Sequence, residues 1–270
     1  MRSVSSMIKI YVILIIYFLF AVIPLWSCLT TSITSTKEVG LISPWVLPPN
    51  PTLEPFSFVL KELARPIYNG LIQELITVTL ACLTGSFLAY YTLIRWKKLI
   101  YLFIVGVFTP PIAASVPTVL TWVKLGLYNT NLALGLTRYA YVVPITVLLF
   151  RSFYAESLLR LIEAARIDGA DDLRIYAQVI LPLSKIPLVV ASSFLFTITW
   201  NCYVWALVLG PGPEARNAIY RLSLFLSIHT PEWNYLMAGV IISSLPVVLL
   251  YVTLGKYILA GYTAGMGKAV

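Results

Sequence analysis

The chain has 270 residues, of which 59% are hydrophobic and only 11% are charged, and its mean hydropathy is +0.88. Soluble domains carry about 25% charged residues, so this composition excludes an ordinary soluble protein and indicates that lipid is the solvent of much of the chain. The net charge of +8 does not predict a nucleic-acid partner. The basic residues form no stripe with aromatic residues, and membrane proteins accumulate Lys and Arg on their cytoplasmic side.

Six apolar segments are long enough to cross a bilayer, since a hydrocarbon core of about 30 Å requires roughly 20 helical residues. They predict transmembrane helices over residues 8–29, 69–94, 99–125, 132–153, 187–209 and 234–254. The third segment contains Pro110, Pro111 and Pro117, which predict a kink or a break. We therefore expect an all-α membrane protein in which residues 1–270 form a single domain.

The segments between the predicted spans differ in character. Residues 30–68 contain six prolines, and because proline blocks regular hydrogen-bond ladders, we expect an ordered loop there. Residues 154–186 are rich in charge, and residues 210–233 form a Gly-Pro loop that holds the single histidine, His229. Residues 256–270 are expected to form a short tail.

The basic residues predict the orientation of the chain. Six spans place both termini on one side, and with the termini inside, 12 of the 19 Lys and Arg residues lie on the cytoplasmic side. Basic residues are enriched in cytoplasmic loops. The sequence therefore predicts cytoplasmic termini, a cytoplasmic loop at 154–186 and an external loop at 30–68.

The cysteine and histidine content predicts neither a metal site nor a cofactor site. Cys28, Cys82 and Cys202 lie in separate apolar runs without C-x-x-C spacing, and His229 has no second histidine beside it. A metal site requires several such ligands at defined spacing.

Residues 156–169 have the pattern of an amphipathic helix that ends at a glycine. The apolar residues recur at helical spacing at Leu158, Leu161, Ile162 and Ala165, so we expect them to share one face. Gly169 suits the left-handed residue that follows a helix.

A second helix is predicted directly after that turn. Asp171 and Asp172 suit its capping position and its first turn, where a negative charge favours the helix dipole. The residues expected to form its apolar face are Leu173, Tyr176, Ala177 and Ile180. Pro182 is expected to end it.

The same loop resembles the EAA motif of the membrane subunits of binding-protein-dependent ABC importers. The matching residues are Glu163, Ala164, Ala165, Asp168, Gly169, Leu181 and Pro182. Their spacing and their place between the fourth and fifth spans carry the resemblance. The extended motif, with residues 181–185, resembles the smaller permease of the maltose-type pair in the carbohydrate-uptake branch.

Other stretches resemble the same subunit, so that the likeness covers nearly the whole chain. They are residues 47–54, 125–130, 200–201 and 256–265. Two places depart from the family pattern: Gly70 stands where a serine is usual, and Met266-Gly267 replaces a more typical Ala-Val.

The resemblance implies a type I ABC importer permease fold with six transmembrane helices in a prokaryotic cell membrane. The implied partners are a second permease subunit, two ATPase subunits, an external solute-binding protein and a sugar substrate. This chain has no Gly-rich phosphate loop, so ATP and Mg²⁺ are expected on the partner ATPase subunits, and this chain is expected to be a transport subunit without catalytic residues. The helix at 156–169 would be the coupling helix, with Glu163, Ala164, Ala165 and Gly169 in the contact and Asp168 bracing the turn.

The candidates for the substrate path are fewer and less specific. Glu74 and Arg138 are charged residues inside predicted spans, where charge is costly and therefore suggests a function. Either residue also fits a position near the outer edge, from which its side chain reaches water. Trp200, Asn201 and Tyr203 on the fifth span offer the aromatic rings and the amide that a sugar site uses, although helix packing explains them as well. Residues 210–233 are expected to reach toward the docked binding protein.

Three other functions remain open from the sequence. An importer for a polyamine or another organic solute would line its path with more charge than Glu74 and Arg138 supply. An ion-coupled secondary transporter would need intramembrane acidic or histidine relays, and a membrane enzyme would need a convergent set of acid, base or metal groups. The one carboxylate cluster, in residues 163–172, lies on the loop.

Overall fold

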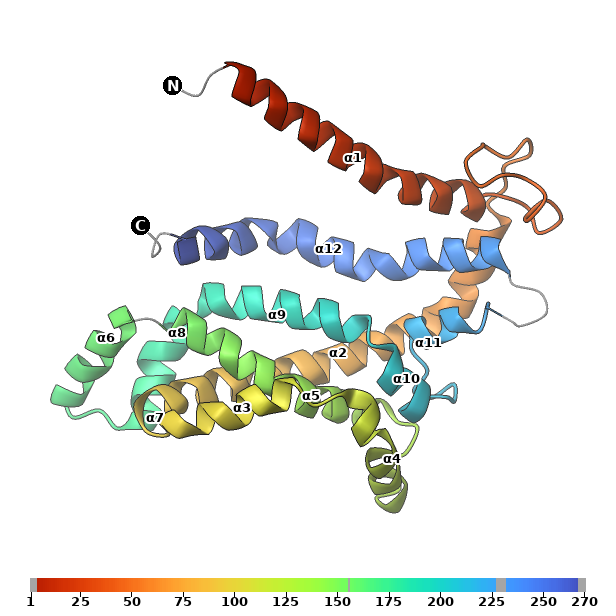
Figure 1. The fold of residues 1–270 in the computed structure, drawn as a ribbon. Helices are drawn as coiled ribbons and strands as arrows, with labels where there is room; N and C mark the ends of the chain where they lie inside the picture. The colour runs from red at the N-terminus through yellow and green to blue at the C-terminus, as the bar shows by residue number, and fades with distance from the viewer. Residues whose placement is uncertain (1–3, 155, 227–231, 267–270) are drawn as a thin grey trace. The chain divides into compact units, whose positions relative to one another are not determined.

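The computed structural model describes residues 4–154, 156–226 and 232–266, which contain helices and no β-strand (Figure 1). His229 lies outside the described residues. Packing divides the chain into two compact units: unit 1 comprises residues 1–64 and 221–245, and unit 2 comprises residues 65–220 and 246–270.

The helices follow one another along the chain, with a long connection at residues 33–53. They are α1 (Val4–Ser32), α2 (Glu54–Ile94), the 3-10 turn η1 (Lys97–Leu99), α3 (Ile100–Val107), the 3-10 turn η2 (Pro111–Ala114), α4 (Ser115–Lys124), α5 (Asn131–Phe153), α6 (Glu156–Ile167), α7 (Asp172–Ile175), the π-helical turn η3 (Tyr176–Ile180), α8 (Leu181–Leu183), α9 (Lys185–Trp200), α10 (Tyr203–Leu209), α11 (Ala218–Ser223) and α12 (Trp233–Met266).

Four of these helices, α1, α2, α5 and α12, are long and apolar enough to cross a membrane. Two bent pairs pass the same test, so the described residues provide up to six spans if each pair forms one span. The predicted fourth span, 132–153, agrees with α5 to within one residue.

The proline-rich segment is shorter as a loop than the sequence predicts. Helix α1 extends to Ser32 and α2 begins at Glu54, before residue 69, where the second span is predicted to start. Pro55 lies in the first turn of α2, where a missing N–H costs no hydrogen bond. Pro66 lies inside the helix, which continues through it to Ile94.

The chain end is also more helical than predicted. Helix α12 continues past the predicted limit at residue 254 as far as Met266, so most of the expected tail is helix. The charge of Lys256 suggests the end of an apolar span when the sequence is read alone. Its ammonium group lies 5.0 Å from the centre of the Tyr257 ring, and a long basic side chain of this kind can stay on a helix while its charge reaches polar surroundings.

Each bent pair has a break with a local cause. Helices in the third predicted span meet at 91°, where Pro110 and Pro111 follow α3, which confirms the predicted break. Prolines there cannot donate the helical hydrogen bonds to residues four positions earlier. The second pair bends by 76° at Ser184. A further break at Asn201 and Cys202 separates α9 from α10, where the sequence predicts one continuous span.

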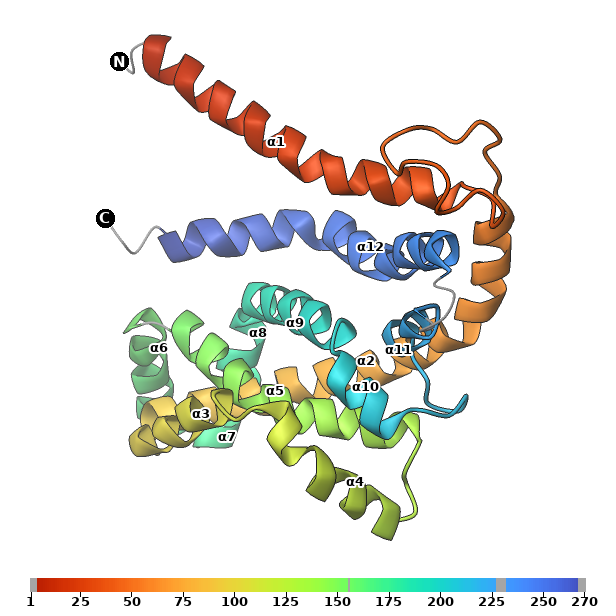
Figure 2. The same ribbon diagram turned by 45° about the vertical axis from the view of Figure 1, so that its right-hand side comes forward.

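Unit 2 has a core in which α2, α5, α6 and α9 meet, with Ala89, Val147, Phe150, Ile162 and Leu195 buried together. In Figures 1 and 2, α6, α7 and α8 gather at one end of α5 and α9, while α10 lies at the other end. Unit 1 is held by contacts such as the stacked rings of Phe58 and Tyr235, 4.6 Å apart. Its buried Asn234 side chain donates to the Thr34 carbonyl at 3.2 Å.

Gly135 allows α5 to approach α2 closely. A Cβ atom at this position would lie 2.8 Å from Ile76 Cβ, and the Gly135 carbonyl accepts a hydrogen bond from Thr77 Oγ1 at 3.0 Å. We expect Gly135→Ala to destabilise the purified chain in detergent by about 1–3 kcal/mol, because overpacking forces the two helices apart.

Gly255→Ala is the matched control for this substitution. A Cβ there meets no atom within 4 Å, and alanine is the better helix former. Thermal unfolding of both variants measures the difference, and equal melting temperatures would contradict the assigned role of Gly135.

Candidate functional site

Helix α6 ends in a hydrogen-bonded glycine turn. The Ala170 N–H donates to the Ala165 carbonyl at 3.0 Å, and the Gly169 N–H donates to the Arg166 carbonyl at 3.0 Å. Gly169 has a φ of 82°, the left-handed conformation that this pair of bonds requires. The predicted turn is confirmed, and it fixes the direction in which the chain leaves α6.

The outer face of α6 is exposed over the motif residues. Glu163, Ala164, Asp168 and Gly169 are exposed, and Ala165 is half-buried. Ile167, at the end of the helix, is 86% exposed. The exposed surface of α6 and its turn therefore combines carboxylates, small residues that allow close approach, and apolar side chains.

The inner face of α6 differs from the prediction at one residue. Leu158, Ile162 and Ala165 pack on the core of unit 2, as expected. Leu161 is 46% exposed, so its predicted place on the buried face is wrong. Leu159 packs on the core in its place.

The second helix begins as predicted but changes its geometry after one turn. Asp171 caps α7, since its carboxylate accepts a hydrogen bond from the Arg174 N–H at 2.7 Å. The π-helical turn η3 then follows. A π-turn adds about one residue to each helical turn, which rotates the residues after it.

The buried face of α7 and η3 differs from the predicted apolar face. Tyr176 and Ile180 are buried as expected, but Ile175 replaces Leu173 on the inside, and Leu173 is 60% exposed. Ala177 is also exposed. With the half-buried Val179, the buried residues Ile175, Tyr176 and Ile180 follow the helical period of 3.6 residues, shifted from the predicted face.

Leu181 and Pro182 lie in the short helix α8, and Pro182 does not end the helical run. Proline occupies the first turn of α8, and the bend follows at Ser184. Leu181 packs on the core of unit 2, whereas Pro182 is exposed.

Three side-chain contacts fasten this α6–α8 loop (residues 156–184) to the long helices. Asp172 accepts hydrogen bonds at 2.9 Å from Arg166 of α6 and at 2.9 Å from Arg95, which follows α2. The Tyr176 and Ser86 hydroxyls are 2.8 Å apart. Ser184 Oγ donates to the Tyr154 hydroxyl at 3.2 Å, directly after α5. The loop is thus attached at several points to α2 and to the residue that follows α5.

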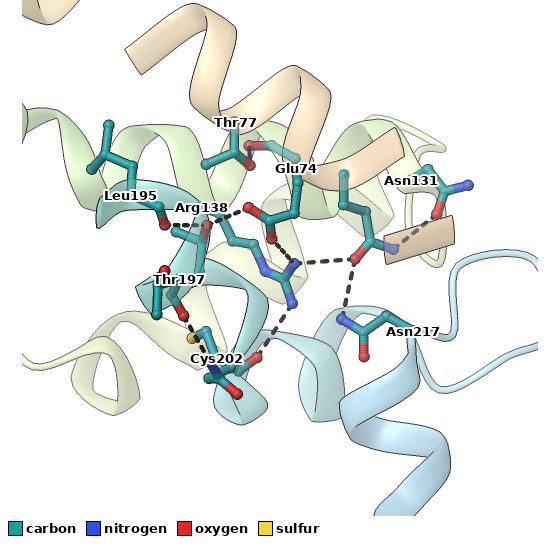
Figure 3. Close-up of polar contacts among 12 residues, drawn as sticks. Glu74, Thr77, Asn131, Arg138, Leu195, Thr197, Cys202 and Asn217 are labelled. Atoms are coloured by element: carbon teal, nitrogen blue, oxygen red, sulfur yellow. Dashed lines mark hydrogen bonds and ion pairs between the residues drawn. The ribbon is translucent and has the colours of Figure 1, made fainter. Parts of the chain in front are cut away.

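A second polar site lies inside unit 2. Figure 3 shows Arg138 of α5 pointing at Glu74 of α2, with Nη1 and Oε1 3.1 Å apart. Both side chains are 1% exposed, so the alternative in which they reach water from the outer edge is wrong. Arg138 Nη2 also donates to the Cys202 carbonyl at 3.2 Å, at the break between α9 and α10.

Amide side chains surround this ion pair. Gln73 Nε2 donates to Asn131 Oδ1 at 2.8 Å and to the Ala215 carbonyl at 2.7 Å. Asn217 Nδ2 donates to Gln73 Oε1 at 3.2 Å, and Asn69 Nδ2 donates to the Arg216 carbonyl at 2.9 Å. We call Asn69, Gln73, Glu74, Asn131, Arg138, Thr199 and Asn217 the buried polar cluster; its Thr199 hydroxyl donates to Glu74. It holds the backbone of residues 215–216 against α2 and α5.

Sequence reasoning found only the two charged members of this cluster. The amides Asn69, Gln73, Asn131 and Asn217 were missed, although a run of amides and one carboxylate at the start of an apolar segment is itself a signal. The hollow beside Arg138 is too narrow to admit a water molecule. The cluster in this structure is a packed polar core.

The other substrate-path candidates do not form one surface. Trp200 is 6% exposed and stacks on Phe196 with ring centres 5.4 Å apart. Asn201 is exposed and donates to the Thr197 carbonyl at 2.8 Å, and Tyr203 is 40% exposed. The family departure at Gly70 has a steric reason here, because a Cβ atom would lie 3.1 Å from the Trp200 ring.

Sequence comparison finds a matching family model and similar proteins. Residues 58–263 match the family model described as "Binding-protein-dependent transport system inner membrane component". A probable ABC transporter permease protein of Pyrococcus horikoshii is 39% identical, over 99% of this chain and 100% of the relative. The trehalose/maltose transport system permease protein of Thermococcus litoralis is 32% identical, over 80% of this chain and 81% of the relative.

A solved structure shares the fold. It is a chain of a bacterial ABC transporter involved in the import of alginate, an acidic polysaccharide, and it matches with a TM-score of 0.71. The match covers 95% of this chain and 99% of that chain at 23% identity. At this identity, the likeness concerns the arrangement of helices.

Asp172 is expected to keep the α6–α8 loop closed against protease. Asp172→Ala removes the acceptor that links Arg166 to Arg95, so we expect trypsin to cleave the native chain after Arg166 several-fold faster, since cleavage follows the population of the open loop. Asp168→Ala is the control on the same exposed turn. Equal cleavage rates in the two variants would refute the clamp.

Removing one partner of the buried ion pair is expected to lower the stability of the chain strongly. Arg138→Met leaves Glu74 buried beside no cation, which costs about 3–5 kcal/mol, and a double variant with Glu74→Leu should recover much of that loss. Arg221→Met is the control: its partner Glu62 is 42% exposed, and such surface pairs are worth about 0–1 kcal/mol. Thermal unfolding in detergent measures all three, and a double variant no more stable than Arg138→Met would argue against the pairing.

Proposed function

The chain belongs to the binding-protein-dependent transport system inner membrane component family of ABC transporter permeases, and we propose that it is one of two permease subunits of an importer that moves a sugar into the cytoplasm. A relative that is 32% identical is named for trehalose and maltose transport, and the loop motif resembles the carbohydrate-uptake branch. An external solute-binding protein delivers the sugar, with residues 210–233 reaching toward it.

The observation that carries this proposal is the exposed face of α6. It presents Glu163, Ala164 and Gly169 on a helix whose end is fixed by its own glycine turn. We assign this face as the coupling helix that docks in a cleft of an ATPase subunit. Glu163 pairs there with basic or polar groups, while the small residues permit close contact and Asp168 braces the turn. Leu181 supports the docked helix from the core side, beside the exposed Pro182.

The same proposal explains why the loop is fastened to the long helices. When ATP draws the two ATPase subunits together, each docked α6 moves with its subunit. The contacts of Asp172, Tyr176 and Ser184 pass that displacement to α2 and α5. Rigid helices then convert it into alternating access of a central path. ATP and Mg²⁺ act on the ATPase subunits, and this chain performs no hydrolysis.

The orientation follows from docking. The α6–α8 loop must face the cytoplasm to meet an ATPase, which agrees with the excess of basic residues counted on that side. In a multi-pass protein with six spans, both termini are then cytoplasmic.

The chain offers little support for the competing functions. Glu74 and Arg138 neutralise each other, so they supply neither a charged lining for a polyamine nor a free proton relay for an ion-coupled secondary transporter. Among the described residues, no group of three His, Cys, Asp or Glu side chains could hold a metal ion. These observations favour an importer for a neutral solute.

The docking role can be tested by co-purification. We expect Glu163→Arg to abolish recovery of the ATPase subunit with the tagged chain from mild detergent, because the reversed charge faces the basic or polar groups of the ATPase cleft. The second permease should still be recovered. Glu232→Arg, the same change at an exposed position before α12, is the control and should retain both partners.

Two results would count against the proposal. One is an ATPase that remains bound to the Glu163→Arg variant. The other is a wild-type chain that purifies alone in a stable form, which would favour the secondary transporter.

A further inference from the structure

The break between α3 and α4 borders a hollow that no member of the buried polar cluster lines. It has a volume of 430 Å³, is open on one side, and is lined by residues of α3, η2, α4, α5 and α10, all within unit 2. Small-molecule sites have volumes of about 300–1,000 Å³. The size and the position beside a discontinuous helix are typical of substrate sites in transporters.

Three aromatic rings form part of the wall. Trp122 is held by a hydrogen bond from its Nε1 to Thr137 Oγ1 at 2.7 Å. Tyr141 is 37% exposed and meets Trp205 edge-on at 6.4 Å. The face of an aromatic ring is electron-rich, so the polarised C–H groups of a sugar ring can stack on it.

One of these rings carries a donor that lacks a partner. Trp205 is 3% exposed, and its Nε1 is buried without a hydrogen bond to any described residue. Because Nε1 is closed off from the hollow, this ring contributes to the wall by its apolar surface.

Threonine hydroxyls supply the remaining polar groups. Thr118 Oγ1 donates to the Ala114 carbonyl at 2.6 Å, and Thr121 Oγ1 donates to the Pro117 carbonyl at 2.8 Å. Their protons are therefore used, and their lone pairs can accept from a ligand. Thr137 accepts from Trp122, so its own proton can be donated. A polyol, in which each hydroxyl both donates and accepts, matches this mixture.

The lining contains no Asp, Glu, Lys, Arg or His. A cationic polyamine or an acidic sugar would enter such a site without a counter-charge, which is costly. We propose that this hollow binds one neutral sugar unit during its passage, with Tyr141 and Trp122 as the stacking surfaces and Thr118 and Thr137 as hydrogen-bonding groups. This inference rests on the proposed function and assigns part of the substrate site to this permease.

Transport by the assembled importer in proteoliposomes tests the stacking surface. The probes are radiolabelled maltose and trehalose, supplied with the binding protein outside and ATP inside. We expect Tyr141→Ala to lower uptake about 5- to 10-fold, as loss of an aromatic contact allows, while ATP hydrolysis stimulated by the loaded binding protein changes less than about 2-fold. Tyr101→Ala is the control, because the Tyr101 side chain on α3 is 68% exposed. This variant should transport as wild type does.

A pair of substitutions at Thr118 separates hydrogen bonding from packing. Thr118→Val keeps the shape and removes the hydroxyl, so uptake should fall, whereas Thr118→Ser should retain it. Unchanged uptake in both Tyr141→Ala and Thr118→Val overturns the site. So does an equal loss in the valine and serine variants, because that result means a packing role.

Cysteine labelling tests the hollow independently of transport. In the assembled importer, a maleimide should modify Thr118→Cys above the background of the three native cysteines, and maltose or trehalose should slow the reaction. Labelling without protection by either sugar overturns the site. Labelling of the isolated chain but not of the importer does so too, because the second permease then fills the hollow. A wild-type importer that moves neither sugar counts against the proposed function instead.

Discussion

The arrangement of unit 2 depends on the interactions of the buried Arg138 guanidinium. It pairs with Glu74 and donates to the Cys202 carbonyl, and so joins α2 and α5 to the break between α9 and α10. Inside a bilayer, a broken helix must find partners for its backbone groups within the protein, because no water is present to supply them. A buried arginine with five donors can serve both a carboxylate and a carbonyl, and the surrounding amides extend the same principle to the backbone after α10.

The α6–α8 loop applies a related principle at the opposite end of the unit. Its exposed face is small and polar, while its inner side is fixed by Asp172, Tyr176 and Ser184 to the ends of α2 and α5. In the proposed docking of α6 on an ATPase subunit, a flexible connector would absorb the movement of that subunit instead of transmitting it.

The buried polar cluster and the hollow beside the α3–α4 break differ in the room they offer. The ion pair and its amides are packed together and leave no room for a solute. The hollow beside the α3–α4 break has room, aromatic faces and hydroxyl groups but no charge. A structure in which charge is used for cohesion and uncharged polar groups face the open space suits a neutral, hydroxylated substrate.

The sequence by itself determined the helical membrane class, the position of α5, the break at Pro110 and the glycine turn after α6, because each depends on local composition or on the backbone limits of one residue type. It misplaced the start of α2 and the end of α12, since prolines and lysines in helices are tolerated by their surroundings and resemble boundaries when read alone. Only the tertiary structure decided that Glu74 and Arg138 face each other 64 residues apart, that Ile175 and not Leu173 faces the core, and that residues of α4, α5 and α10 meet around one hollow. Such outcomes depend on which helices pack together, and packing brings together residues whose partners lie far along the chain.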